Sequence, residues 1–185
     1  MNNFENEYGH IIGKVLKAKA KVIGRNGSVR QITGAQLRAD LREGFPIVTG
    51  KEIYPNSVFI ETEWMLKGGT NIKWLNSKGV HIWDQWADSK GDLGPVYGKQ
   101  ITDFEGINQA KTLISGLKTN INSRRHIITM WRPSDIDSMV LPPCHYSMQI
   151  VHERGFLDIV VSMRSLDLFV GLPYDMGMYA IILAS

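Results

Sequence analysis

The segment Leu141-Pro142-Pro143-Cys144-His145 contains the only cysteine of the 185-residue chain, and the fold is best worked out from the residues around it. Each proline fixes φ and lacks a backbone N–H, so the chain leading to Cys144 is expected to be stiff and extended rather than helical. The thiol should therefore occupy a defined place. On these residues alone a buried, inert thiol is the more common outcome, and a nucleophile is the alternative.

The composition indicates about one globular domain, residues 1–185, large enough to bury a core. Hydrophobic residues make up 43% of the chain, and no apolar run suggests a membrane span or a signal peptide. A single cysteine excludes an intramolecular disulfide, so a cytoplasmic location is expected. The net charge of +3 suits a small anionic ligand and is too weak to indicate nucleic acid. No metal ion is expected.

Apolar residues recur at helical spacing in some segments and alternate in others. Helices are predicted at 3–16, 56–67 and 106–119, with a short one ending at 75 and a last one beginning at Asp175. Strands are predicted at 28–41, 127–131, 146–150 and 156–163, with turns at 24–27, 153–155 and 171–174. The second helix should be capped by Asn56 or Ser57. Its residues spaced for burial are Val58, Phe59, Thr62, Met65 and Leu66.

Several polar and aromatic residues could serve a site, although each also has a simpler structural role. Arg25 on a turn could bind phosphate, and the pair Arg124-Arg125 before a strand could serve two different partners because adjacent residues there point to opposite faces, but solvated surface charge is more common for arginine. Glu61, on a mostly apolar helix, could be a poised acid or base. The tryptophans of segment 83–86 could stack on a flat heterocycle, whereas their spacing alone favours a place in the core.

Five segments, in order and at family spacing, closely resemble thymidylate synthases: Trp83–Asp88, Gly91–Gly98, Asn122–Arg125, Leu141–His145 and Arg164–Asp175. The resemblance runs from about Arg25 to the last residue. It implies an α/β (α+β) fold with a mixed twisted sheet flanked by helices, and a homodimer packed sheet to sheet. It also implies a one-carbon transferase whose substrates are a pyrimidine deoxynucleotide and 5,10-methylenetetrahydrofolate.

The resemblance identifies Cys144 as the nucleophile that adds to C6 of the pyrimidine. C5 of the ring is a poor nucleophile until addition at C6 produces an enolate or enamine, and a thiolate is strong enough to add near neutral pH. A free thiol has a pKa of about 8.5, so it needs positive charge nearby. Arg164 resembles the family arginine that supplies this charge and also holds the 5′-phosphate. Glu61 resembles the glutamate that organises water and proton transfer at the base.

The other expected site residues follow from the same resemblance. The remaining phosphate ligands are Arg25 and Ser165, together with Arg124 and Arg125 donated by the neighbouring subunit. The residues expected to line the nucleotide pocket are Tyr97, His145 and Gln149. The residues expected to receive the folate are Ile82, Trp83, Asp167, Gly171 and Leu172, with Asp167 hydrogen-bonded to the pterin.

Asp175 departs from the thymidylate synthase pattern, which has asparagine at this position. An asparagine amide donates to O4 of uracil and accepts from N3–H, whereas a carboxylate only accepts. Cytosine presents a 4-amino group and an unprotonated N3, so Asp175 could accept from the amino group and stabilise a proton at N3; helix capping is its simpler role. Aspartate at this place is a feature of the dCMP hydroxymethylases of some large DNA phages, and Arg132–Ser134 and Met163 also resemble that branch.

The sequence therefore predicts a transferase that converts dCMP, 5,10-methylenetetrahydrofolate and water into 5-hydroxymethyl-dCMP and tetrahydrofolate, in the host cytoplasm if it is phage-encoded. The alternative enzyme is a thymidylate synthase or a dUMP hydroxymethylase, because Trp83 and Trp86 could still shield a C5 methylene from water. The alternative from another class is a truncated nucleotide-binding paralogue. It arises because family members continue past the helix of Asp175 with ribose-binding residues and a segment that closes over the folate.

Overall fold

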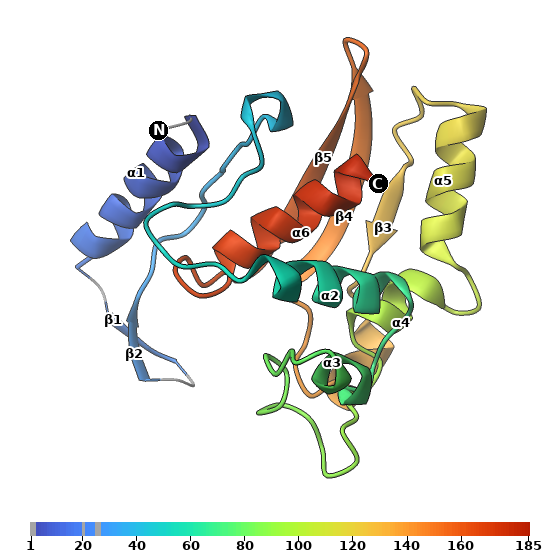
Figure 1. Cartoon of the computed structure of the whole chain (residues 1–185), viewed down its shortest axis with the longest axis horizontal. Helices are drawn as coiled ribbons and strands as arrows, with labels where there is room; N and C mark the ends of the chain where they lie inside the picture. Colours follow the sequence, from blue (N-terminus) through green and yellow to red (C-terminus); the bar gives the residue numbers. More distant parts are fainter. Residues whose placement is uncertain (1–2, 20, 25–26) are drawn as a thin grey trace. The chain divides into compact units, whose positions relative to one another are not determined.

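The computed structural model describes residues 3–19, 21–24 and 27–185 (Figure 1). It contains both helices and paired strands, so the predicted α/β class is confirmed. The elements in chain order are α1 (Asn3–Lys17), β1 (Lys21–Gly24), β2 (Gly27–Arg30), η1 (Leu41–Glu43), α2 (Pro55–Leu66), α3 (Lys73–Ser77), α4 (Tyr97–Thr102), α5 (Gln109–Thr119), β3 (Ile127–Thr129), η2 (Pro133–Ser138), β4 (His145–Glu153), β5 (Phe156–Met163) and α6 (Leu172–Ala184).

Contacts divide the chain into two compact units. The first unit consists of Met1–Ile53 and Leu168–Ala180, and the second of Tyr54–Asp167 and Ile181–Ser185. The prediction of one domain over residues 1–185 stays a prediction. Among the described residues, no helix is long and apolar enough to cross a membrane.

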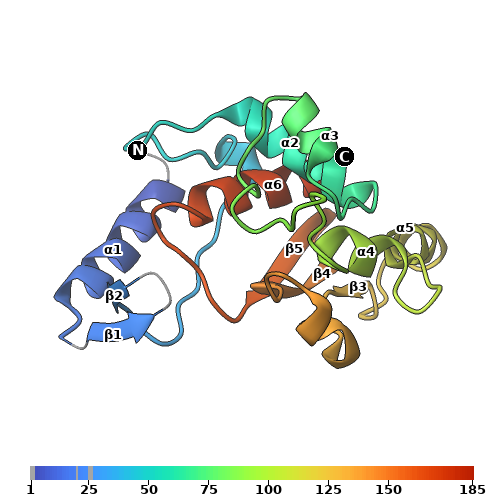
Figure 2. The ribbon, with the colours of Figure 1, turned by 90° about the horizontal axis from the view of Figure 1, so that it is seen from below.

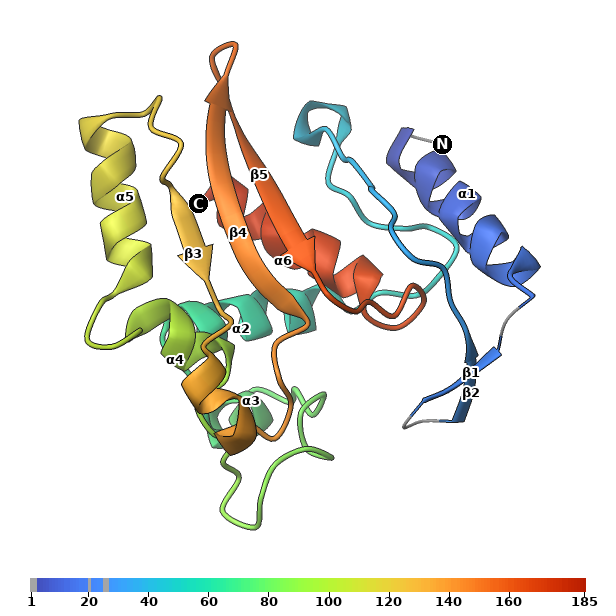
Figure 3. The ribbon, with the colours of Figure 1, turned by 180° about the vertical axis from the view of Figure 1, so that it is seen from behind.

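The second unit is built on an antiparallel sheet in the order β3-β4-β5 (Figure 3). β4 and β5 form a hairpin whose turn places Arg154 and Gly155 at φ of 53° and 83°. Positive φ at both positions matches the right-handed twist of the strands. The pairing of β4 with β5 is irregular between His145 and Ser147. Tyr146 lies at this irregularity and is 40% exposed.

The two faces of this sheet differ in burial. Cross-strand partners share a face, and one face carries the paired and buried side chains of Ile128 and Met148. The opposite face carries Ile127, Gln149 and Val160 at one level of the register, and both its apolar members are about half exposed. The second face is therefore a partly apolar surface without a covering layer among the described residues of its own unit.

Helices of the second unit pack at the β3 side of the sheet, with α5 running alongside β3 (Figures 1 and 3). α4 contacts α2, α5 and β3, and its Ile101 is fully buried. A Cβ atom at Gly98 would lie 2.4 Å from the carbonyl oxygen of Gly69. The first turn of α4 can therefore approach the loop after α2 only because residue 98 has no side chain.

The core of the first unit lies beneath α1. Phe4 and Tyr8 project from one face of this helix and pack against Val48 and Leu172. The two rings are stacked with centroids 6.3 Å apart, and the Tyr8 hydroxyl donates to the carbonyl oxygen of Leu168 at 2.7 Å. The helix predicted at 3–16 is confirmed, and the β1–β2 hairpin follows its C-terminal end (Figure 2).

The strand predicted at 28–41 is wrong beyond Arg30. β2 pairs only with the four-residue β1, so no partner strand continues past that point in the described residues. Gly34 then takes a φ of 71°, which ends an extended course. Leu37 and Ala39, within the predicted strand, instead pack as irregular chain against the core of the first unit.

The predicted second helix exists as α2, but its predicted cap at Asn56 or Ser57 is wrong. The helix begins at Pro55 with Tyr54 as the N-cap and no side-chain cap. Proline suits this position because its fixed φ is already helical and the first N–H has no partner in a helix. Phe59, expected to be buried, is 54% exposed.

Two further helix boundaries differ from the prediction. α6 begins at Leu172 rather than at Asp175, so the turn predicted at 171–174 is already helical, with Pro173 in the first turn, where proline is tolerated. α5 begins at Gln109 because the side chain of Asn108 accepts the N–H of Lys111 and caps it. No α5 residue is fully buried, so its predicted apolar face is only partly covered.

Candidate active site

The segment 140–143 before Cys144 is not helical, as its prolines predict, and the backbone of Cys144 is held on both sides. Its N–H donates to the hydroxyl oxygen of Tyr97 at 2.7 Å, and its carbonyl oxygen accepts the backbone N–H of Arg164 at 2.9 Å. The cysteine is free and partly exposed. The thiol therefore stands on a fixed backbone with access to solvent, as a nucleophile requires.

Arg164 is anchored to the same segment by its side chain. Its Nε donates to the carbonyl oxygen of Pro143 at 2.9 Å, and one terminal nitrogen donates to that of Pro142 at 2.8 Å. The guanidinium carbon also lies 5.6 Å from the ring centroid of Trp131, within reach of a cation–π interaction. A permanent positive charge is thus fixed on the two residues that precede Cys144.

A continuous array of aromatic rings connects the cysteine to Glu61. The Trp83 indole N–H donates to a carboxylate oxygen of Glu61 at 2.8 Å. The Trp83 and Tyr97 rings meet edge to face with centroids 6.3 Å apart, and the Tyr97 and His145 ring centroids are 5.5 Å apart. The side chains of Glu61, Trp83, Tyr97 and His145 are therefore brought together beside Cys144, although they come from distant parts of the chain.

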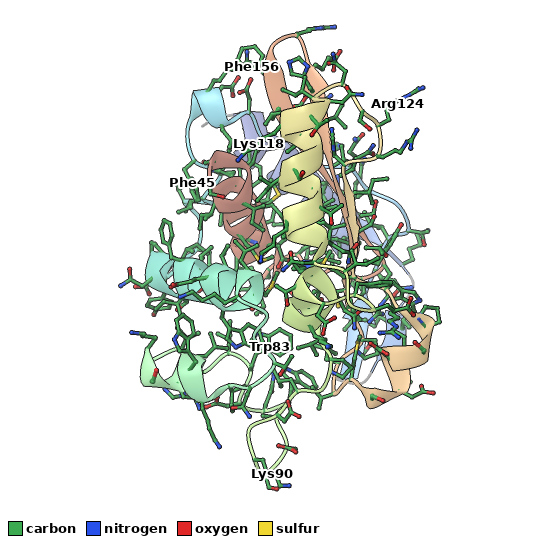
Figure 4. The ribbon with its side chains drawn as sticks, turned by 90° about the vertical axis from the view of Figure 1, so that its right-hand side faces the viewer. Phe45, Trp83, Lys90, Lys118, Arg124 and Phe156 are labelled. Atoms are coloured by element: carbon green, nitrogen blue, oxygen red, sulfur yellow. The ribbon has the colours of Figure 1, made fainter. Side chains whose placement is uncertain are left out.

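The loop that delivers Tyr97 to this array is fixed by a carboxylate. The backbone N–H groups of Asp92 and Lys90 donate to Asp88 at 2.8 Å each. These donors hold the pKa of Asp88 below its ordinary value, the Asp92 N–H contributing most. Figure 4 shows Lys90 at the tip of this loop, on the side away from the helices.

Ile82 and Trp83 are exposed to different degrees. Trp83 is 8% exposed and lies among the helices of the second unit (Figure 4), whereas Ile82 is 45% exposed. Ile82 lines a pocket of about 510 Å³ together with Lys78 and His81, and the other lining residues are Tyr54, Asn56, Ser57, Ile60, Gly79 and Val80. The sequence prediction missed this pocket, because Tyr54 and Lys78 are separated by a whole helix–loop–helix segment.

Arg124, Arg125 and Gln149 are not brought to Cys144. Both arginines are exposed, and Figure 4 shows Arg124 near the hairpin end of the sheet, far from Trp83. The side-chain amide of Gln149 donates to the carbonyl oxygen of Arg124 at 3.1 Å. Because a strand rises about 3.4 Å per residue, Gln149 sits roughly 17 Å along β4 from Cys144.

The remaining residues predicted for the site lie on other segments of the chain. Ser165 and Asp167 are exposed and directly follow β5. Gly171, Leu172 and Asp175 belong to the first unit, where the Asp175 N–H donates to the carbonyl oxygen of Gly171 in the first turn of α6. Arg25 lies outside the described residues. Among the residues that the structure describes, no group of three or more His, Cys, Asp or Glu side chains could hold a metal ion.

Two comparisons with known proteins identify the family of this chain. The family model described as "Thymidylate synthase" matches residues 6–184. Proteins named "Thymidylate synthase" from two strains of Coxiella burnetii, Dugway 5J108-111 and RSA 331 / Henzerling II, are each 41% identical over 182 residues. The match covers 95% of this chain and 69% of each relative. This chain belongs to the thymidylate synthase family.

Proposed function

We propose that this protein transfers one carbon to C5 of dCMP, using 5,10-methylenetetrahydrofolate and water, and releases 5-hydroxymethyl-dCMP and tetrahydrofolate. Membership of a folate-dependent family supports the transfer at C5 of a pyrimidine nucleotide. The choice of base rests on one observation: position 175 is an aspartate, where the family has asparagine. The relatives named above are thymidylate synthases, so methylation of dUMP is the second candidate.

The contacts around Cys144 support addition of its sulfur to C6 of the base. The Arg164 guanidinium is tied to the carbonyl groups of Pro142 and Pro143, the two residues that precede Cys144, so its charge belongs to the segment that carries the thiol. Addition at C6 makes C5 an enamine carbon, which can attack a one-carbon unit at the oxidation level of formaldehyde. The folate supplies that unit.

Glu61 is suited to proton transfer because its position is defined. The Trp83 indole holds the carboxylate at one oxygen, and Trp83 in turn packs against Tyr97, which bonds the Cys144 backbone. In the proposed reaction Glu61 orients the water that adds to the exocyclic methylene, and it exchanges protons with the base. His145 and Tyr97 shape the wall beside it.

Asp175 is the residue proposed to select cytosine. Its carboxylate accepts a hydrogen bond from the 4-amino group and stabilises a proton at N3, which withdraws electron density and makes C6 more electrophilic. Uracil would instead direct its O4 at a negative charge. A site built for a donor rejects an isostere without one by several kcal/mol, because buried polar groups are left unpaired.

The pocket at Ile82 is the proposed place for the outer part of the folate. It combines apolar wall from Ile60 and Val80 with the basic groups of Lys78 and His81. Folates carry an aromatic ring followed by glutamate carboxylates, and this combination matches both features.

The catalytic site is proposed to be completed by a second copy of the chain. Arg124 and Arg125 lie far from Cys144 within one chain, and the sheet face of Ile127 and Val160 is partly apolar and uncovered within its unit. Packing these faces would allow each subunit to donate its arginines to the phosphate of its partner. The dianion would then meet bidentate donors from both chains.

Product analysis tests the proposal. The protein is incubated with dCMP or dUMP and 5,10-methylenetetrahydrofolate, and the nucleotides are identified by mass. The proposal expects a 5-hydroxymethyl product from dCMP with no rise in dihydrofolate absorbance. Turnover of dUMP alone, with dihydrofolate formed, would establish the synthase instead. Nucleotide binding without a product from either base would favour the non-catalytic paralogue.

A further inference from the structure

Arg132 is a mostly buried cation that joins three segments of the second unit. One terminal nitrogen lies 3.1 Å from a carboxylate oxygen of Glu105, and the other lies 3.5 Å from one of Asp135. The guanidinium carbon is 5.7 Å from the ring centroid of Phe104. The side chains of Arg132 and Asp135 are 25% and 17% exposed, so their contact is screened less than an ordinary surface ion pair, whereas Glu105 is 63% exposed.

The Asp135 carboxylate links Arg132 to the buried helix α4. Gln100 is 1% exposed, and its side-chain amide donates at 2.8 Å both to Asp135 and to the carbonyl oxygen of Pro95. Two buried atoms of this cluster, Arg132 Nε and Gln100 Oε1, have no hydrogen-bond partner among the described residues. Unpaired buried polar atoms reduce stability, so stability alone does not account for the cluster.

The segment that the cluster anchors is the one that leads to Cys144. Asp135 lies in η2 (Pro133–Ser138), and the chain then continues through Val140, whose N–H donates to the carbonyl oxygen of Leu93 at 3.1 Å. The packing is close here, because a Cβ atom at Gly94 would lie 2.1 Å from the carbonyl oxygen of Ser138. A displacement of η2 would therefore also displace the residues that follow it, up to Cys144.

A second connection starts at Trp131, the residue directly before Arg132. Trp131 is the ring over which the Arg164 guanidinium lies, and Arg164 holds the carbonyl groups of Pro142 and Pro143. Two routes thus connect Arg132 to Cys144. One runs forward through η2, and the other runs through Trp131 and Arg164.

We propose that Arg132 is a positioning residue for Cys144, which holds the thiol in line with C6 of the bound base through η2 and the Trp131–Arg164 pair. This inference rests on the proposed function, because it assigns a role in the addition step of that reaction. Lysine cannot replace the arginine fully, since one ammonium group cannot span Glu105 and Asp135 as a planar fork does. Small displacements of a nucleophile reduce rate strongly while leaving binding of the substrate unchanged.

The test compares Arg132→Met with Arg154→Met, which removes the same charge from the exposed hairpin turn. Arg132→Met should lower kcat for the nucleotide by about 10- to 100-fold with KM unchanged. Hydrogen exchange should become faster at the backbone N–H groups of the segment 139–145, which are those of Met139, Val140, Leu141, Cys144 and His145. Arg154→Met should change neither quantity. Asp135→Asn, which keeps the side-chain shape, should reproduce the loss, and its effect should not add to that of Arg132→Met. Arg132→Lys should recover only part of kcat.

Two results would overturn the proposal. One is an unchanged kcat in both Arg132→Met and Asp135→Asn, and the other is unchanged exchange at 139–145 in these variants. Should the wild-type protein convert no nucleotide, the proposed function fails, and the exchange measurement still decides whether Arg132 holds the cysteine segment. If Arg132→Met does not fold, Asp135→Asn is compared with Arg154→Met in its place.

Discussion

Replacing Tyr97 with phenylalanine removes the one oxygen atom that accepts the backbone N–H of Cys144 at 2.7 Å. Tyr97 is buried and its ring packs between Trp83 and His145, so phenylalanine keeps these contacts. A buried N–H left without an acceptor costs about 1–3 kcal/mol. In a chain of this size, that loss should lower Tm by about 2–12 °C. The cysteine segment should also loosen, and kcat should fall by about tenfold or more with KM unchanged.

Tyr146→Phe is the matched control, because it makes the same chemical change two residues after Cys144 on a side chain that is partly exposed. Exposed substitutions of this kind change stability by less than about 0.5 kcal/mol. Both variants are compared by urea unfolding at one protein concentration and by steady-state kinetics. If Tyr97→Phe behaves like Tyr146→Phe in both assays, the hydroxyl of Tyr97 does not hold the cysteine and the reasoning is refuted.

Three further predictions concern the dimer, the packing and the acid stability. The variants Cys144→Ser and Arg125→Ala should each be inactive alone, and refolding a mixture of the two should restore activity. In the mixed dimer, one of the two sites has Cys144 from one chain and Arg125 from the other. No recovery would mean that Arg125 does not act across the interface. Gly98→Ala should lower the free energy of unfolding by about 1–3 kcal/mol, since its Cβ would meet the carbonyl oxygen of Gly69, and an unchanged urea midpoint would contradict this contact. The Arg42 side chain and backbone N–H lower the pKa of Asp40 from 3.8 to about 2, so its contribution to stability is present above pH 3.8 and is lost as the pH falls toward 2. Asp40→Asn should flatten this part of the pH profile of urea unfolding, and an identical profile would show that the pair contributes nothing.

The helices could be predicted from the sequence where apolar residues repeat over several turns, as in α1 and α2. Their ends could not, because single residues decide them. Pro55 starts α2 earlier than a side-chain cap would, and Leu172 starts α6 before Asp175. The strand predicted past Arg30 failed for a different reason, since a strand needs a partner and its partner has only four residues.

The candidate site was predictable to the extent that its residues match the family in order and spacing, as Cys144 and Arg164 do. The contacts that fix them were not. Arg164 donates hydrogen bonds to two backbone carbonyl groups and lies over Trp131. Because every residue has a backbone carbonyl group, the pattern of residue types does not predict which one accepts a hydrogen bond. The only signal in the sequence for the Arg132 cluster was the resemblance of Arg132–Ser134 to the hydroxymethylase branch.

The choice of base is measured by the ratio of kcat/KM for dCMP to kcat/KM for dUMP, in the wild-type protein and in Asp175→Asn. The wild-type protein should favour dCMP by roughly a thousandfold or more, because uracil would leave the carboxylate facing an oxygen. Asp175→Asn, which restores the donor that uracil needs, should shift the ratio strongly toward dUMP. A wild-type protein that prefers dUMP, or a ratio that Asp175→Asn leaves unchanged, would contradict the account.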